Sequence, residues 1–326
     1  MTGLKQQLTL RVENDLKDIE TALKDNLNPH LDLVRQTASH LIFSGGKRIR
    51  PLLNMLSARL CGYTDEFIKK FSTIIEFLHT ATLLHDDVVD GASIRRGKPV
   101  AHSIWGAPVT VLVGDFLLAR ALSIASETQN PKIIKVIAEI TESMCQGEIL
   151  QLIKKGDIHL TETQYMDVIK RKTGFLIQGA CRTGAILAGA CAETENKLSK
   201  YGYHIGIVFQ IADDLLDYTA NTSVLGKSVG ADLKEGKLTL PVIYTLAHTN
   251  PDNRAWMERV ITRKNFSGDE FKTLIKLMED TGGIRYCREI AKDHINQAKN
   301  IIRTFEPSET RKTLIMIADY TLNRNA

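Results

Sequence analysis

Two acidic clusters with identical spacing interrupt apolar stretches of this sequence. Each has aspartates at its first, second and fifth positions, and together they comprise Asp86, Asp87, Asp90, Asp213, Asp214 and Asp217. If both stretches are helical, the first and fifth carboxylates of a cluster share one helix face, where like charges repel. This arrangement predicts a bound hard cation, and Mg²⁺ fits best because it takes few carboxylates together with waters and phosphate oxygens. A solvated acidic face is the alternative for either cluster alone, and the repetition argues against it.

Short basic segments could bind the phosphate that such a metal site would share. Segment 44–51 places two glycines and three cations before a helix expected to begin near its final proline, and segment 95–99 opens with two arginines just after the first acidic cluster. Helix N-termini and arginine forks both bind phosphate oxygens. A glycine helix cap with solvated cations is the alternative for segment 44–51. Lys172, Lys227 and Lys237 are further cations, each of which taken alone fits a surface lysine.

Two histidines lie close to the first acidic cluster in sequence. His79 precedes Asp86 by two helical turns, where it could donate to a phosphate, and a satisfied core histidine is an equally good interpretation. His85 directly precedes Asp86 and is compatible with a His-Asp phosphohydrolase that binds a divalent metal. That alternative leaves the second acidic cluster unexplained.

Helices must position these groups, because apolar residues recur at steps of three and four and no run alternates with period two. Glycines and prolines divide the pattern into about a dozen helices. Two long apolar helices are expected, at about 161–191 and about 194–220, and both should be buried. No linker is visible, so the sequence predicts an all-α fold with one large helical bundle that spans residues 1–326 as a single domain.

Composition restricts the class of protein. Hydrophobic residues make up 43% and charged residues 25%, which excludes disordered and collagen-like chains and is typical of a globular enzyme. The net charge is 42 − 38 = +4, too small for a general nucleic-acid binder. The five cysteines form no C-x-x-C pair, which favours a reducing cytoplasm. The start of the sequence lacks an apolar signal core, and Asp115 and Arg182 interrupt the most apolar stretches, so we expect no membrane span.

The order of these motifs resembles that of the trans-polyprenyl diphosphate synthases, and most closely the bacterial long-chain enzymes of octaprenyl diphosphate synthase type. The motifs are GGKRIRP, LLHDDVVD, RRGK, KT, FQ-x-x-DDLLD and GK, and the likeness covers roughly residues 30–320. The resemblance implies a single polyprenyl synthetase domain of the isoprenoid synthase type, with helices around a deep central cavity. It also implies a homodimer.

The resemblance further implies a chain-elongation reaction. An allylic diphosphate, farnesyl or geranyl, would ionise, isopentenyl diphosphate would attack the carbocation in trans, a proton would be lost, and the cycle would repeat. Mg²⁺, usually three ions, would be held by Asp86, Asp90, Asp213 and Asp217. Asp87 and Asp214 would support these ligands, and Lys172 would join the six aspartates as a catalytic group. The metals would stabilise negative charge on the leaving diphosphate.

The same resemblance assigns two diphosphate sites. The isopentenyl diphosphate site would comprise Lys47, Arg50, His79 and Arg96. The allylic diphosphate site would comprise Arg95, Lys172, Thr173, Gln210, Lys227 and Lys237.

The resemblance also bears on product length. Ala81 and Thr82, one turn before the first cluster, are small where short-chain enzymes carry bulky residues, which predicts a long product of about C35 to C45, with C40 favoured, for quinone side chains. Such a product would reside in the membrane. Ile137 is the candidate for the floor of the product tunnel, with Leu122 and Ala125 nearby, and ordinary core packing is the alternative for each.

Three other activities remain open. A shorter-chain synthase, making geranylgeranyl or farnesyl diphosphate, would share every motif. A class I terpene cyclase would need no isopentenyl diphosphate site and rarely repeats the aspartate triplet. A regulatory subunit of a heteromeric synthase would typically lack one of the clusters.

Overall fold

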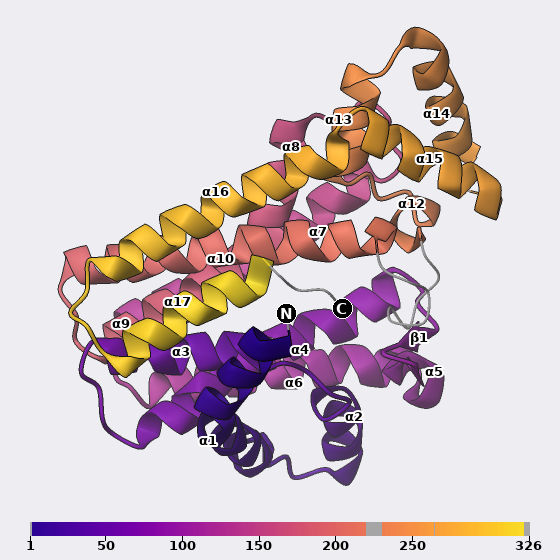
Figure 1. Cartoon of the computed structure of the whole chain (residues 1–326). Helices are drawn as coiled ribbons and strands as arrows, with labels where there is room; N and C mark the ends of the chain where they lie inside the picture. The colour runs from indigo at the N-terminus through magenta and orange to yellow at the C-terminus, as the bar shows by residue number, and fades with distance from the viewer. Residues whose placement is uncertain (1, 220–229, 264, 323–326) are drawn as a thin grey trace. The chain divides into compact units, whose positions relative to one another are not determined.

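Almost every element of this protein is a helix, which confirms the all-α prediction (Figure 1). The computed structural model describes residues 2–219, 230–263 and 265–322. Within these ranges the only strands are β1 (Ile94–Arg95) and β2 (Lys98–Pro99), an antiparallel pair in which Ile94 lies opposite Pro99. The hairpin follows the helix that ends in the first acidic cluster.

Two compact units can be distinguished, and both are discontinuous in sequence. Unit 1 consists of Met1–Thr141, Leu176–Gly202 and Ile301–Ile317, and unit 2 of Glu142–Phe175, Tyr203–Asn300 and Ala318–Ala326. All five boundaries between them fall inside helices. The single-domain interpretation stays a prediction.

Unit 1 is built around an apolar helix that carries the first acidic cluster. Its helices are α1 (Thr2–Leu27), α2 (Asp32–Ile42), α3 (Ile49–Leu60), α4 (Phe67–Val89), α5 (Ala101–Trp105), α6 (Ala107–Ser126) and parts of α7 (Pro131–Lys154), α9 (Phe175–Leu187), α10 (Ala192–Thr219), α16 (Gly283–Arg303) and α17 (Glu309–Leu322). Helix α4 packs against α6, α3 and α1, and buries Phe71, Ile74 and Phe77. The first acidic cluster therefore ends a helix whose body is fixed in the core.

Close packing of α3 on α9 depends on a glycine. A Cβ atom at Gly184 would lie 2.3 Å from the Asn54 carbonyl oxygen, so a side chain there would push the two helices apart. The buried Asn54 amide donates to the Ala180 carbonyl at 2.9 Å and to the Thr183 hydroxyl oxygen at 3.0 Å. These bonds satisfy polar groups that would be costly to bury alone.

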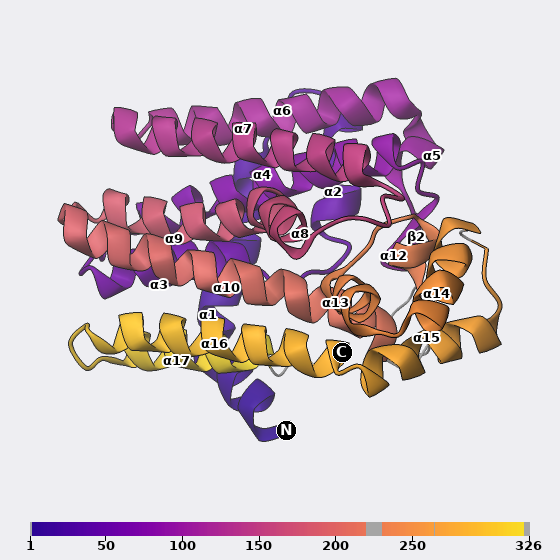
Figure 2. The same ribbon diagram turned by 90° about the horizontal axis from the view of Figure 1, so that it is seen from above.

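Unit 2 holds the second acidic cluster and the helices that surround it. Apart from its parts of α7, α10, α16 and α17, it contains α8 (Glu162–Ile169), the π-helical turn η1 (Lys170–Gly174), α12 (Ala231–Lys234), α13 (Leu240–His248), α14 (Pro251–Arg263) and α15 (Gly268–Asp280). Figures 1 and 2 show α13, α14 and α15 grouped beside α12. Two backbone N–H groups of α12 donate to the Asp217 carboxylate, which ties α12 to α10.

The helix expected at about 161–191 is in fact interrupted. A capping box at Thr161 starts α8. The chain then widens into η1 before α9 begins at Phe175. A Cβ atom at Gly206 of α10 would lie 2.8 Å from the Gly174 Cα atom, so α10 packs backbone to backbone against this turn. π-helical turns are rare and often lie at functional sites.

Helix α6 is the one helix in the described ranges that is long and apolar enough to cross a membrane, judged by length and composition alone. It packs against α4 and buries Val113, Leu117 and Ile124. A partly buried core helix passes the same test, so the finding is weak support for a membrane span.

Candidate active site

The first acidic cluster lies at the C-terminal end of α4 and is divided by burial. Asp86 and Asp90 are half-buried, and the Asp90 backbone N–H donates to the Asp86 carbonyl at 2.8 Å, which keeps both in one helical turn. Asp87 is only 1% exposed and accepts bonds from Nε and Nη2 of Arg95, both at 2.8 Å. Asp87 is thus paired within the protein by Arg95. Their assignment as metal ligands stays a prediction.

The two arginines after this cluster have different partners. Arg96 and Gly97 form the turn of the hairpin with φ values of 52° and 74°, the left-handed pair that a two-residue hairpin turn requires. Arg95 faces Asp87, and Arg96 donates to the Gly45 carbonyl. Arg96 therefore joins the hairpin to the glycine-rich segment 44–51.

The middle cation of segment 44–51 is structural. Arg48 is 5% exposed and donates to Glu20 at 2.6 Å and to Glu76 at 2.5 Å. It orders the loop, while Lys47 beside it is exposed. Arg50 lies in the first turn of α3, which begins at Ile49, two residues before the expected proline start.

His79 lies among these cations. Its pKa is held well below the usual value, first by loss of water and then by the positive charges of Arg50, Arg96, Arg95 and Arg48. The imidazole is therefore neutral at neutral pH and retains one N–H to donate. Three of the four residues expected at the isopentenyl diphosphate site, Arg50, His79 and Arg96, thus share one electropositive region of unit 1.

His85 serves a packing role. Its Nε2 atom lies 3.0 Å from the Val111 carbonyl oxygen and 3.6 Å from an Asp115 carboxylate oxygen. A Cβ atom at Gly114 would lie 2.2 Å from the same ring nitrogen, so the imidazole packs directly on α6. Because the His85 ring contacts α6, it does not support the His-Asp phosphohydrolase interpretation.

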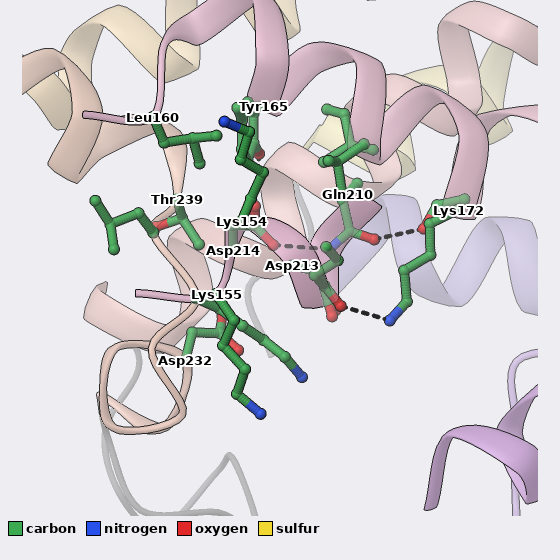
Figure 3. A pocket seen from close by; sticks show the side chains of 16 residues that line it. Lys154, Lys155, Leu160, Tyr165, Lys172, Gln210, Asp213, Asp214, Asp232 and Thr239 are labelled. Atoms are coloured by element: carbon green, nitrogen blue, oxygen red, sulfur yellow. Dashed lines mark hydrogen bonds between the residues drawn. The ribbon is translucent and has the colours of Figure 1, made fainter. Parts of the chain in front are cut away.

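The second acidic cluster lies beside a pocket of about 160 Å³ within unit 2 (Figure 3). The Thr173 hydroxyl donates to Gln210 Oε1 at 2.7 Å, and Gln210 Nε2 donates to Asp214 Oδ1 at 2.7 Å. The Tyr165 hydroxyl donates to the other Asp214 oxygen at 2.5 Å. This chain of bonds fixes the Gln210 amide and joins the π-helical turn to the acidic cluster. It brings together Thr173 and Gln210, both expected at the allylic site.

Three aspartates lie close together in this pocket. The pKa of Asp214 is raised well above its usual value, chiefly by burial and then by the charge of Asp232, while bonds from Tyr165 and Gln210 oppose the rise and Asp213 adds to it. All three carboxylates line the pocket. A divalent cation would relieve their repulsion, and an all-oxygen donor set suits Mg²⁺.

Among the described residues, no three His, Cys, Asp or Glu side chains form a complete metal cage.

Asp217 differs from its neighbours in the cluster. It does not line the described pocket, and its carboxylate accepts the backbone N–H groups of Ala231 at 3.2 Å and Asp232 at 3.1 Å. Asp217 therefore holds the segment that brings Asp232 to the pocket. Its role as a metal ligand stays a prediction.

The lysines expected at the allylic site lie as follows. Lys172 donates to Gln151 Oε1 at 2.8 Å and pairs with Glu148, and Figure 3 shows its side chain extending toward Asp213. Lys237 lines the same pocket. Lys227 lies outside the described residues.

With this geometry in place, comparison with known proteins decides the family. The sequence model of the polyprenyl synthetase family matches residues 31–278. The chain belongs to this family. It is 36% identical to the octaprenyl diphosphate synthase of Escherichia coli (strain K12) over 311 residues, which cover 95% of this chain and 96% of that protein. It is equally 36% identical to a short chain isoprenyl diphosphate synthase of Methanothermobacter thermautotrophicus over 295 residues, covering 89% and 90% of the two chains.

A solved structure supports the same conclusion. The polyprenyl synthase of Caulobacter crescentus CB15, complexed with calcium and isoprenyl diphosphate, superimposes with a TM-score of 0.92 at 37% identity and 98% coverage of both chains. This polyprenyl synthetase is therefore a trans-prenyltransferase with the all-α isoprenoid synthase fold.

The residues expected to set product length are mostly buried in unit 1 of the synthetase. Ala81, Ala125 and Ile137 have exposures of 4%, 0% and 0%, and the Thr82 hydroxyl donates to the His79 carbonyl at 2.9 Å. Leu122 is 38% exposed and lies on the outer side of α6. Burial agrees both with a tunnel wall and with core packing, so these roles stay predictions.

Sequence reasoning missed several pocket residues. Asp232 and Tyr165 contact Asp214 electrostatically or by a hydrogen bond, and Lys154 and Lys155 line the pocket. None of the four belongs to a repeated motif. The pair Lys154-Lys155 directly before a glycine was a visible signal of the type that identified segment 44–51.

Proposed function

We propose that this synthetase elongates an allylic diphosphate with successive isopentenyl diphosphate units in a Mg²⁺-dependent reaction. The proposal rests on one observation: each aspartate cluster lies in a region that also contains the cations needed to bind a diphosphate. Asp86, Asp90 and Asp213 would hold the metal ions, and bound Mg²⁺ would stabilise negative charge on the departing diphosphate.

The protein's own groups bind and orient the two substrates. Arg50, Arg96 and neutral His79 form the electropositive region that would bind the isopentenyl diphosphate. Thr173, Gln210 and Lys172 line the second pocket and would bind the allylic diphosphate. No protein nucleophile is required, and the departed diphosphate would accept the proton.

Two acidic residues would act by position. Arg95 neutralises Asp87 and so fixes the last turn of α4, where Asp86 lies. Tyr165 and Gln210 fix Asp214 next to Asp213 on α10. Each of these aspartates directly follows a proposed metal ligand in the chain, so fixing its side chain also helps to fix the position of that ligand.

A long product, C35 to C45 with C40 favoured, follows from the small side chains at Ala81 and Thr82. Its use in quinone side chains follows from the octaprenyl diphosphate synthase resemblance. Relatives of equal identity make octaprenyl and short-chain products, so a geranylgeranyl or farnesyl diphosphate synthase is the competing assignment. A bulky residue at position 81 would shorten the product if the chain grows past this helix.

A homodimer is supported by the exposed face of α6. Leu112 is 66% exposed, Leu122 38% and Val111 37% on this helix. Large apolar side chains left exposed along one helix suit an interaction surface. We propose that a second copy of the chain covers this face.

We also propose that the enzyme works in the cytoplasm and that its product enters the membrane.

Product analysis tests the whole proposal. The purified chain is incubated with farnesyl diphosphate, isopentenyl diphosphate and Mg²⁺, and the dephosphorylated products are separated by chain length. A ladder ending near C40 is expected, and in the variant Ala81→Phe the ladder should end earlier. A cyclic hydrocarbon formed without isopentenyl diphosphate would indicate a terpene cyclase, and no turnover by the single chain would indicate a regulatory subunit.

A further inference from the structure

A pair of lysines that belongs to none of the family motifs ends α7 at the second pocket. Lys154 is the last residue of α7 and Lys155 follows it, and both line the pocket shared by Asp213, Asp214 and Asp232. Figure 3 shows the two lysines on one side of the pocket and Lys172 on the other. The pocket therefore has cations on two sides of its carboxylates.

Backbone hydrogen bonds hold this lysine pair in place. Gly156 and Gly236 both adopt left-handed φ values, of 85° and 81°, and the Gly156 N–H donates to the Gly236 carbonyl at 2.7 Å. The next residue, Lys237, donates its backbone N–H to the Asp232 carbonyl at 2.7 Å. The turn that carries Lys154 and Lys155 is thus joined to the turn that carries Lys237, and through Asp232 to the acidic pocket.

The charge of the pocket shows what these lysines add. Four lysines line it, namely Lys154, Lys155, Lys172 and Lys237, against three aspartates. The family motifs account for only Lys172 and Lys237. Lys154 is 29% exposed, so it has lost much of its water, and it pairs at 3.1 Å with Asp157, a neighbour in the same turn. An ammonium group in that position can bind a phosphate oxygen without breaking a packed contact.

We propose that Lys154 and Lys155 form an additional wall of the allylic diphosphate site and bind the diphosphate group directly. The inference rests on the proposed function, since it takes the second pocket as the place where that group binds. In each elongation cycle the same wall would bind the diphosphate of the lengthened product when it returns as the allylic substrate. The effect belongs to binding and leaves the chemical step unchanged.

Binding of inorganic pyrophosphate tests the proposal. Calorimetric titration of the full chain in the presence of Mg²⁺ should show a dissociation constant about tenfold higher for K154Q/K155Q than for the wild type, since each lysine contributes a partly exposed charge contact. The charge-preserving variant K154R/K155R should stay within about threefold of the wild type. In steady-state assays the KM for the allylic diphosphate should rise in K154Q/K155Q with kcat nearly unchanged.

Two controls separate direct binding from other effects. K276Q/K292Q removes the same charge from exposed positions of unit 2, α15 and α16, and should leave pyrophosphate binding unchanged. D157N removes the ion pair of Lys154 but keeps the lysine, and should also bind as the wild type does. Equal affinity in K154Q/K155Q and K276Q/K292Q, or an equal loss in D157N, would overturn the inference.

The outcomes also distinguish the two proposals. D213N should lose both turnover and Mg²⁺-dependent pyrophosphate binding if the second pocket is the diphosphate site. If D213N fails in this way while K154Q/K155Q matches the wild type, only the lysine inference is wrong. If the wild type forms no elongated product or binds no pyrophosphate, the proposed function and the inference both fail.

Discussion

The two acidic clusters have the same sequence pattern but opposite electrostatic surroundings. At the second position of the first cluster, Asp87 is paired with a cation, Arg95. At the same position of the second cluster, Asp214 accepts hydrogen bonds from two neutral donors, Tyr165 and Gln210, and lies near the like charge of Asp232. The middle aspartate of the first cluster is thus neutralised by an arginine, whereas the middle aspartate of the second cluster is held by hydrogen bonds from uncharged groups.

The largest expected effect comes from removing the leading aspartate of either cluster. Asp86→Ala and Asp213→Ala should each reduce condensation by about a thousandfold or more, because each deletes a metal ligand whose charge stabilisation is worth several kcal/mol. Initial rates with saturating Mg²⁺ measure the loss, and circular dichroism should show unchanged helix content. A variant of either kind with more than a tenth of the wild-type rate would contradict the account.

Removing the partners of the two middle aspartates should give unequal losses of stability. Arg95→Ala leaves buried Asp87 without its cation and should cost about 2–3 kcal/mol, reduced from the usual cost for a buried pair because Arg95 is 28% exposed. Tyr165→Phe removes one hydrogen bond to Asp214 and should cost about 1 kcal/mol. Urea unfolding of both variants without divalent ions makes the comparison, and equal losses would remove the proposed difference between the clusters.

Asp214→Asn should stabilise the metal-free protein while impairing catalysis. Because the pKa of Asp214 is raised in the folded state, folding favours its neutral form, and stability falls as pH rises from the unfolded carboxyl pKa of about 3.9 through the folded value. An amide avoids that loss, so the melting temperature near pH 7 in EDTA should rise by on the order of 2 °C. The gain should shrink as the pH is lowered toward 4. A melting temperature below that of the wild type at every pH would show that the negative charge is well accommodated without metal.

His79 provides a pH effect of the opposite direction in unit 1. Its pKa is lowered in the folded state, so folding favours the neutral imidazole and stability is lost as pH falls below the unfolded pKa of about 6.5. This single group can contribute up to about 1.4 kcal/mol per pH unit in that range. His79→Gln should flatten the decline between pH 6.5 and pH 5 in urea titrations. An unchanged slope would mean that the surrounding arginines do not exclude the proton.

Much of this arrangement could be predicted from the sequence, because it depends on spacing within single helices. The aspartates at the first and fifth positions of each cluster fall in one helical stretch, as their spacing requires, and α10 runs from Ala192 to Thr219, close to the expected range. The interruption at η1 was not predictable, because it arises where Gly174 packs on Gly206 of a distant helix segment.

Contacts between segments distant in sequence explain why other residues of the site could not be predicted. Asp232 reaches the pocket because Asp217 binds its backbone N–H, and Tyr165 reaches it from α8. Residue type alone could not separate Arg48, which is buried against Glu20 and Glu76, from the adjacent cations of the same segment. Whether a charged residue is buried in an ion pair therefore depends on partners that lie far away in the sequence.

The most direct test is a crystal structure of the enzyme with Mg²⁺ and a non-hydrolysable bisphosphonate. The account predicts that Asp86 at the end of α4, Asp90 directly after it and Asp213 of α10 coordinate the Mg²⁺ ions, with Lys172 on oxygens of the bisphosphonate. Ions bound at other residues, with either cluster left without metal, would contradict the claim that these aspartates hold the Mg²⁺.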